Sequence, residues 1–206
     1  LYRLDPAKEV VYEGQRIVVR TIVREFMSKI VERDRAYAPF IIEALEQKFA
    51  VPFDTGKQTI VLGGKIDRVD RKGQQVRVID YKTGKDELGV ESIESLFDGT
   101  GRRNKAAFQT MLYAFLFDKE LKDPAAKLVP GLLNRKNLFE ENFSFGHPLG
   151  RGRDKRVIDD ARQFFPEFED RLRHTLSELY DPSVPFDQTP NVKACSFCSY
   201  KGICRR

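Results

Sequence analysis

Three charged side chains have the types and the spacing for phosphoryl chemistry. Asp67 ends one β-rich run, and Asp80 and Lys82 lie two residues apart on the next. Residues i and i+2 of a strand point to the same face. A hairpin turning at 71–75 would therefore bring Asp80 and Lys82 across from Asp67. The pattern predicts two carboxylates and one ammonium group in a small volume.

Such a group suits a divalent cation, because two neighbouring carboxylates repel each other unless a positive charge lies between them. Mg²⁺ is commonly held by one or two carboxylates, waters and phosphate oxygens, and it activates a bound water. Lys82 would orient that water or stabilise developing negative charge, and the main-chain carbonyl of Tyr81 would add an oxygen ligand. The alternative is structural: Asp67 marks a strand end, and Asp80 and Lys82 form an ion pair.

Three ordered motifs contain these residues. Residues 64–70 read GKIDRVD, residues 78–84 read VIDYKTG, and residues 109–113 read QTMLY, with Gln109 and Tyr113 on one face of an expected helix. Together they resemble the PD-(D/E)XK nuclease superfamily, above all the nuclease domains of RecB- and AddB-type helicase-nucleases. The resemblance spans residues 46–113, about a third of the chain.

The resemblance implies a role for each matching position. Asp67 and Asp80 would bind the metal ion, Mg²⁺ or Mn²⁺, and Lys82 would be the catalytic lysine. Gln109 and Tyr113 would line the site and either touch DNA or support the lysine.

Two further features of the family are less directly matched. Glu46 resembles an upstream helix glutamate that supports the metal site, with Glu43 as the competing choice and a solvated helix position as the alternative for both. Many members also carry a metal-binding histidine on an early helix. The histidines here, His147 and His174, follow the motifs and are expected to be ordinary surface residues.

The cysteines gather at the end of the chain. Cys195, Cys198 and Cys204 resemble the three C-terminal cysteines of iron–sulfur members of the family, in which a fourth lies far upstream. A [4Fe–4S] cluster usually needs four cysteines, and this sequence has none before position 195. A cluster completed from outside the chain, a degenerated cluster, a zinc site with another ligand, and free cysteines all remain open.

The elements that would position these residues indicate an α/β fold, a central mixed sheet flanked by helices as in restriction-endonuclease-like cores. Helices are expected at 15–34, 39–47, 105–119 and 156–179, the last bent or split at Pro166, and strands at 49–53, 58–69, 75–81, 128–133 and 142–145. The expected division is a nuclease domain at 1–190 and a cysteine-containing tail at 191–206. The sequence begins without Met, which suggests a fragment of a longer protein.

Composition fits an intracellular, cytoplasmic protein rather than a secreted or membrane one, and the family resemblance implies a bacterial origin. Of 206 residues, 41% are hydrophobic and 33% charged, and no apolar run is long enough to span a membrane. The net charge of +5 and the isoelectric point near 9.1 favour an anionic partner. Two basic clusters, 102–105 and 151–156, would contact DNA phosphates without reading sequence, or form solvated loops.

The leading hypothesis is thus a Mg²⁺-dependent DNA exonuclease domain of a helicase-nuclease in DNA repair or recombination. The sequence contains no G-x-x-x-x-G-K-[ST] motif, so a helicase would have to be another domain or subunit. Two alternatives stay open. One is a stand-alone nuclease like those of CRISPR adaptation, and the other is a catalytically inactive DNA-binding domain of the same fold.

Overall fold

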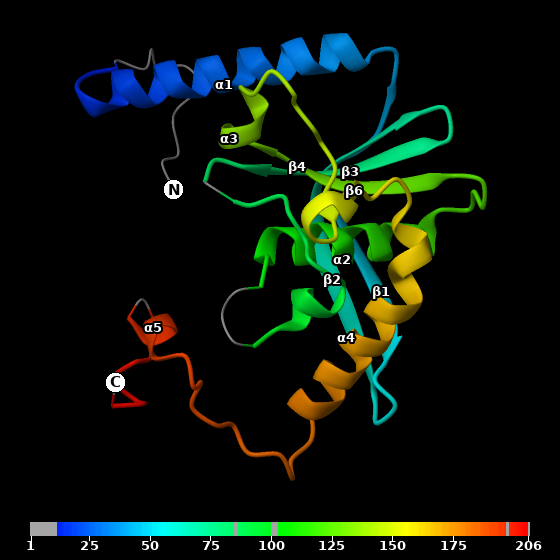
Figure 1. The fold of residues 1–206 in the computed structure, drawn as a ribbon, viewed down its shortest axis with the longest axis vertical. Coiled ribbons are helices and arrows are strands. Elements are labelled where there is room, and N and C mark those ends of the chain that lie inside the picture. Colours follow the sequence, from blue (N-terminus) through cyan, green and yellow to red (C-terminus); the bar gives the residue numbers. More distant parts are fainter. Residues whose placement is uncertain (1–11, 85, 100–102, 197, 206) are drawn as a thin grey trace, which may run out of the picture.

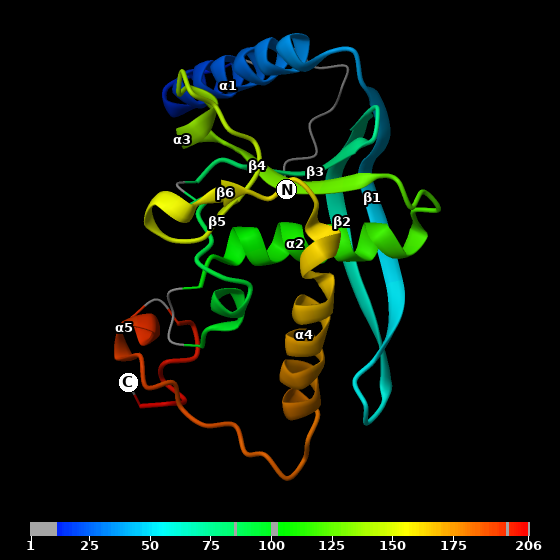
Figure 2. The ribbon, with the colours of Figure 1, turned by 45° about the vertical axis from the view of Figure 1, so that its right-hand side comes forward.

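The computed structural model describes residues 12–84, 86–99, 103–196 and 198–205. Figures 1 and 2 show a layered arrangement, with α1 and α3 on one face of a sheet and α2 and α4 on the other. The described helices are α1 (Gln15–Tyr37), η1 (Glu94–Phe97), α2 (Lys105–Glu120), α3 (Arg135–Leu138), η2 (Gly152–Asp154), η3 (Ala161–Phe164), α4 (Phe165–Leu179) and α5 (Val192–Cys195). The strands are β1 (Ile41–Asp54), β2 (Thr59–Lys72), β3 (Gln75–Lys82), β4 (Lys127–Asn134), β5 (Pro148–Leu149) and β6 (Arg156–Val157).

Within these residues, four strands form a mixed sheet in the order β1-β2-β3-β4, and β5 and β6 form a separate hairpin. The pairs β1–β2 and β2–β3 are antiparallel, and Gly73 makes the tight β2–β3 turn at a positive φ of 59°. Strand β4 runs parallel to β3, and α2 makes the crossover between them. The predicted α/β class with a mixed, helix-flanked sheet is confirmed.

The main core lies between the sheet and α2. Val69 and Val78, which are paired across β2 and β3, are fully buried with Met111 and Phe115 of α2. Helix α4 adds Phe168, which stacks near Phe115 with ring centroids 6.2 Å apart. Side chains two residues apart on a strand point to the same face. Asp67 lies two residues before Val69 and Asp80 two residues after Val78, so both carboxylates lie on the α2 face of the sheet.

The other face of the sheet packs a smaller cluster under α1. Ile30 of α1, Ile79 of β3, and Leu133 and Leu138 around α3 are buried together. Arg33 of α1 donates hydrogen bonds to the main-chain carbonyl of Leu138. The predicted first helix therefore exists, but only one of its residues, Ile30, is buried.

The predicted helix at 39–47 is wrong, because this segment begins the long strand β1. The β-branched Ile41 and Ile42 favour a strand, and β1 pairs with β2 along nearly its whole length. A register shift between Ile42 and Ala44 breaks the two-residue alternation. The shift leaves apolar residues at a spacing that reads as helical in the sequence.

Two later predictions also need correction. Residues 142–145 form no strand; the chain there passes Gly131, where a Cβ would lie 2.2 Å from the carbonyl oxygen of Phe145. The predicted helix at 156–179 is instead β6, η3 and then α4, so Pro166 lies in the first turn of α4 rather than inside a longer helix. None of the described helices combines the length and apolar character that crossing a membrane requires.

Candidate active site

The site begins with Asp67 on β2 and Asp80 on β3. The register pairs Arg68 with Ile79, and continuing it by one residue places Asp67 level with Asp80. The strands are also joined there by the main-chain N–H of Tyr81, which donates a hydrogen bond of 2.9 Å to Asp67 Oδ2. Asp80 is buried, whereas Asp67 is half-buried at the open side.

A chain of polar contacts links Asp80 to α2 through Lys82. Lys82 Nζ lies 2.7 Å from Asp80 Oδ2 as an ion pair and donates a hydrogen bond of 2.9 Å to Gln109 Oε1. Gln109 Nε2 in turn donates to the hydroxyl of Tyr113 at 2.7 Å. Helix α2 therefore holds the ammonium group beside the buried carboxylate.

Tyr113 is itself held by close packing against β2. Its exposed fraction is 9%, and Gly64 faces its ring so closely that a Cβ there would lie 2.6 Å from Tyr113 Cε1. The glycine in the GKIDRVD segment thus permits the approach of α2 to the sheet. Tyr113 supports Gln109 from a buried position and does not face solvent.

The surroundings of Asp80 destabilise its charged form, so its pKa is raised. Burial raises the pKa of Asp80, Lys82 lowers it, and Asp67 and Asp86 raise it further by charge repulsion. Asp80 Oδ2 is buried, and apart from the ion pair with Lys82 at 2.7 Å it has no hydrogen-bond partner among the described residues. Asp86 is a third carboxylate near the site, and the sequence motifs did not point to it.

These residues fit a divalent cation held in the manner of Mg²⁺. A cation would relieve the repulsion among Asp67, Asp80 and Asp86 and would supply a partner for the orphaned oxygen of Asp80. The described residues contain no cluster of three or more His, Cys, Asp or Glu side chains arranged around a metal position. Mg²⁺ needs no such cluster, since water and phosphate oxygens usually complete its shell.

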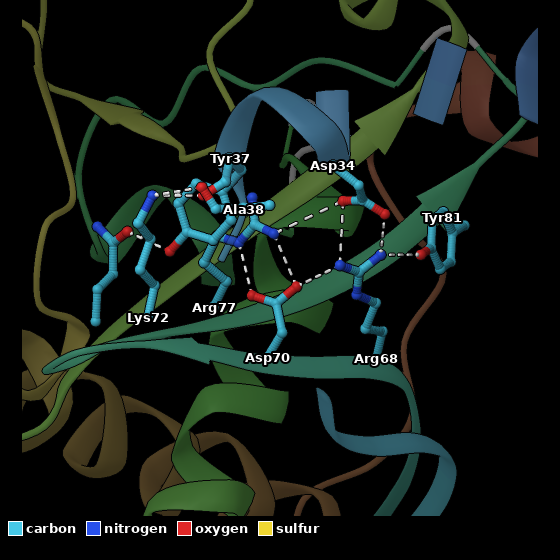
Figure 3. A network of polar contacts seen from close by, with 9 residues as sticks. Asp34, Tyr37, Ala38, Arg68, Asp70, Lys72, Arg77 and Tyr81 are labelled. Atoms are coloured by element: carbon cyan, nitrogen blue, oxygen red, sulfur yellow. Dashed lines mark hydrogen bonds and ion pairs between the residues drawn. The ribbon is translucent and has the colours of Figure 1, made fainter. Parts of the chain in front are cut away.

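On the opposite face of the sheet, a buried ionic network connects α1 to the same two strands (Figure 3). Arg68 Nη1 donates hydrogen bonds to Asp34 Oδ2 at 2.7 Å and to the Tyr81 hydroxyl at 3.2 Å. Asp70 pairs with Arg68 at 2.7 Å and accepts two hydrogen bonds from Arg77. Burial alone would lower the pKa of Arg68, but the hydrogen bonds that Arg68 donates to Asp34 and Tyr81 and the charge of Asp70 raise it on balance.

The network explains why charged residues adjoin the site residues on both strands. Arg68 directly follows Asp67, and Tyr81 lies between Asp80 and Lys82. Neighbouring residues of a strand face opposite sides, so the network fixes β2 and β3 from below while the carboxylates stand above. Tyr81 thereby contributes to both faces, through its amide on one side and its hydroxyl on the other.

The loop after β3 is anchored beside the site by three buried or half-buried side chains. Asn134, paired with Lys82 across β3 and β4, donates to the main-chain carbonyl of Asp86 at 2.7 Å. Asn104, the N-cap of α2, donates to the carbonyls of Glu87 and Gly89. The third side chain is His147, whose Nδ1 lies 2.8 Å from the main-chain carbonyl oxygen of Leu88.

The expectation that His147 is a surface residue is wrong. The ring is 1% exposed, and its Nε2 lies 2.7 Å from Thr110 Oγ1 of α2. A carbonyl only accepts, so Nδ1 carries the proton toward Leu88, and Nε2 accepts from Thr110. Burial lowers the pKa of His147 to about 4, so the ring is neutral at pH 7. His174, by contrast, is exposed on α4 as expected.

The model of the PD-(D/E)XK nuclease superfamily matches residues 4–205, nearly the whole chain. The chain belongs to this superfamily. No curated protein matches it. Among solved structures, the crystal structure of SSO0001 is similar, with 14% sequence identity and a TM-score of 0.42, over 93% of this chain and 70% of that one.

Within this nuclease, Glu46 does not occupy the helix on which its expected role depended. It lies on β1 with a positive φ of 50°, between the pairs Leu45–Arg68 and Gln47–Ile66, and so is level with Asp67. Its side chain is 63% exposed and pairs with Lys65. Glu43, the competing choice, pairs with Arg71 instead. A site role for Glu46 would have to come from the strand, next to Asp67.

The C-terminal cysteines of this nuclease form no disulfide among the described residues. Cys195 ends α5, and Cys198 and Cys204 follow in turns. They are not arranged as a metal-binding group with any other described His, Cys, Asp or Glu. As arranged, the tail does not fit an iron–sulfur cluster or a zinc ion.

Proposed function

We propose that this chain is a metal-dependent deoxyribonuclease that hydrolyses phosphodiester bonds at Asp67, Asp80 and Lys82. The observation that carries the proposal is the contact of Lys82 with both Asp80 and Gln109, on strands that place Asp67 level with Asp80. Membership of the nuclease superfamily supports hydrolysis of nucleic acid, and the buried, partner-poor oxygen of Asp80 supports binding of Mg²⁺ or Mn²⁺.

In the proposed reaction, Asp67 and Asp80 hold the cation, and the main-chain carbonyl of Tyr81 is available as a further oxygen ligand. A cation held there would polarise the scissile phosphate and lower the pKa of a bound water. Lys82, held between Asp80 and Gln109, would stabilise negative charge on the phosphate as the P–O bond to the leaving oxygen breaks. Gln109 and Tyr113 hold the ammonium group in position.

The finer biological role is proposed from the motif resemblance. The domain would be the exonuclease part of a helicase-nuclease that acts on DNA ends in cytoplasmic DNA repair or recombination. Support comes from the order and spacing of the GKIDRVD, VIDYKTG and QTMLY segments. The helicase would be a partner subunit or another domain of the same protein.

An iron–sulfur cluster is a separate question from cleavage. Three cysteines without a fourth ligand leave a [4Fe–4S] cluster incomplete, so a cluster would need a ligand from outside the described residues. No step of the proposed reaction uses it.

The test uses end-labelled single- and double-stranded DNA incubated with Mg²⁺, Mn²⁺ or EDTA. Wild type should cleave with metal and not with EDTA, and Asp80→Asn should abolish cleavage while DNA binding in EDTA persists. Short products that accumulate from a labelled end would support an exonuclease. If wild type binds DNA but cleaves with neither metal, the domain is a binding module and the catalytic proposal is wrong.

A further inference from the structure

A groove of about 1540 Å³ opens beside the proposed active site. It is lined by the loop after β3, the start of α2, the turn between β5 and β6, and the segment around α5. In Figure 2 the β5–β6 hairpin lies above the start of α2, and α5 lies below it. Segments far apart in the sequence therefore share one surface.

Basic side chains enter the groove from three of these segments. Arg103 and Lys105 come from the start of α2, Lys155 from the β5–β6 turn, and Lys193 from α5. All four are exposed, and none makes an ion pair with another described residue. Unpaired cations gathered on one concave surface attract a polyanion.

The groove also contains acidic residues, but they are partly accounted for. Glu91 is paired with Arg151, and Glu87 lies 3.5 Å from Lys136. Asp86 lies at the end that meets the active site, since Asn134 bonds to its carbonyl and is paired with Lys82. Asp98 is the fourth acidic residue of the lining, which therefore contains five Lys or Arg and four Asp or Glu side chains among the described residues.

The wall formed by the loop after β3 is held in place. The four consecutive main-chain carbonyls of residues 86–89 are hydrogen-bonded by Asn134, Asn104 and His147. A surface that is already fixed by hydrogen bonds needs little ordering when a ligand binds. The groove is therefore a preformed part of the fold.

The chemistry of the lining indicates which part of a nucleic acid it contacts. None of the described residues that line the groove is aromatic, and many are charged or polar. Lysine and arginine side chains bind phosphates without reading sequence. The lining therefore suits a sugar–phosphate backbone.

We propose that this groove binds the backbone of a single DNA strand and leads it past Asp86 to Asp80, with Lys193 making the α5 segment one wall of the path. The proposal rests on the proposed nuclease function, because it names the route of that enzyme's substrate. It also brings members of both basic clusters of the sequence, 102–105 and 151–156, to one surface, namely Arg103, Lys105, Arg151 and Lys155. Arg102 of the first cluster lies outside the described residues.

The test is binding of fluorescein-labelled dT20 in EDTA, followed by anisotropy across a range of NaCl concentrations. The variant is Arg103→Glu/Lys155→Glu/Lys193→Glu. The matched control is Lys48→Glu/Lys122→Glu/Lys127→Glu, which reverses three exposed lysines that lie outside the groove and make no ion pair with another described residue. Both variants change the net charge by the same amount, so a difference between them reports position.

We expect the groove variant to bind at least roughly tenfold more weakly than the control, with a log–log salt slope smaller by about 2, since each phosphate contact on a single strand contributes about 0.7. The milder Arg103→Gln/Lys155→Gln/Lys193→Gln variant should show the same ranking, and circular dichroism should show intact folds. A mixed-sequence strand should give the same ratio as dT20. Equal binding by the groove and control variants would overturn the proposal.

Cleavage separates this proposal from the nuclease proposal. If wild type cleaves and the groove variant binds and cleaves like the control, the groove is not the path although the enzyme is a nuclease. If wild type does not cleave, but only the groove variant has weakened dT20 binding, the groove proposal is supported and the catalytic proposal fails. Preference for duplex DNA or RNA over dT20, unaffected by the groove variant, would overturn the single-strand path.

Discussion

The main-chain N–H of Tyr81 donates a hydrogen bond of 2.9 Å to Asp67 Oδ2, so the residue between Asp80 and Lys82 fixes the carboxylate on the neighbouring strand. The Tyr81 hydroxyl reaches the other face of the sheet, where Arg68 donates to it at 3.2 Å. The site is thereby tied to the buried ionic network under α1. Substitutions at Arg68, Lys82, His147 and Gly64 test separate contacts of the site and its supports.

Arg68→Met should destabilise the fold far more than Tyr81→Phe. Asp70 is fully buried, and loss of Arg68 leaves it with Arg77 alone and takes a partner from Asp34. Breaking a buried ion pair typically costs about 3–5 kcal/mol, whereas Tyr81→Phe removes one hydrogen bond, worth about 1 kcal/mol. Urea denaturation at pH 7 measures both. Similar losses for the two variants would mean that the network adds little beyond packing.

Lys82→Ala should lower the rate of DNA cleavage by about 10²–10³-fold, as removal of a transition-state charge stabiliser does. Gln109→Ala should lower kcat less, because it frees the ammonium group to move without removing it. Both variants should bind dT20 in EDTA like wild type. The check is single-turnover cleavage with Mn²⁺ at saturating enzyme. A Lys82→Ala variant as active as wild type would remove the lysine from the proposed mechanism.

Lys82→Met should also raise the pKa of Asp80. Burial already raises this pKa, and Lys82 is the group that opposes the rise, while Asp67 and Asp86 add to it. A carboxyl with a raised pKa is protonated at higher pH, so the acid limb of metal binding should move to higher pH in the variant. A ¹³C NMR titration of the metal-free protein follows the Asp80 carboxyl directly. An unchanged or lower pKa would show that the ion pair is absent in solution.

The sequence predicts contacts between residues that are close together in the chain better than contacts between distant segments. Asp67, Asp80 and Lys82 lie on one hairpin, so a two-residue period and a glycine turn suffice to predict that they come together. Gln109 was placed by resemblance, since no local rule brings α2 to β3. The hairpin and α2 are strongly periodic, and both were predicted with boundaries close to those observed.

The missed features come from contacts between distant segments. Asn134 and His147 anchor the loop after β3 from 48 and 59 positions away, and nothing in their local sequence signals this. Asp86 lies in an irregular loop after the VIDYKTG motif, so no strand or helix periodicity in the sequence predicts that it lies near Asp80. In β1 the register shift near Ala44 imitates helical spacing, and only pairing with β2 reveals the strand.

His147 should make the fold sensitive to acid. Burial lowers its folded-state pKa to about 4 from the ordinary 6.5, so below pH 6.5 the unfolded chain takes up a proton that the folded chain resists. Stability is complete above pH 6.5 and falls as the pH drops toward 4, by about 3 kcal/mol for this group. Urea denaturation between pH 4.5 and 7 should show this loss in wild type and a smaller one in His147→Gln. Parallel curves for the two proteins would contradict it.

Gly64→Ala should disturb the site through Tyr113. The added Cβ would lie 2.6 Å from Tyr113 Cε1, so the ring must move, and with it the hydroxyl that holds Gln109. Overpacking of this kind costs about 1–3 kcal/mol, and cleavage should fall because Gln109 positions Lys82. Gly99→Ala, where a Cβ meets nothing within 4 Å, is the control and should change neither property.

A double-mutant cycle separates this clash from a general effect of alanine at position 64. In a Tyr113→Ala background the ring is absent, so Gly64→Ala should cost much less in unfolding free energy than it does in wild type. The difference between the two costs is the coupling between Gly64 and the ring. If the two substitutions are instead additive, α2 does not rest on β2 through this contact, and the support of Lys82 by way of Tyr113 and Gln109 must be abandoned.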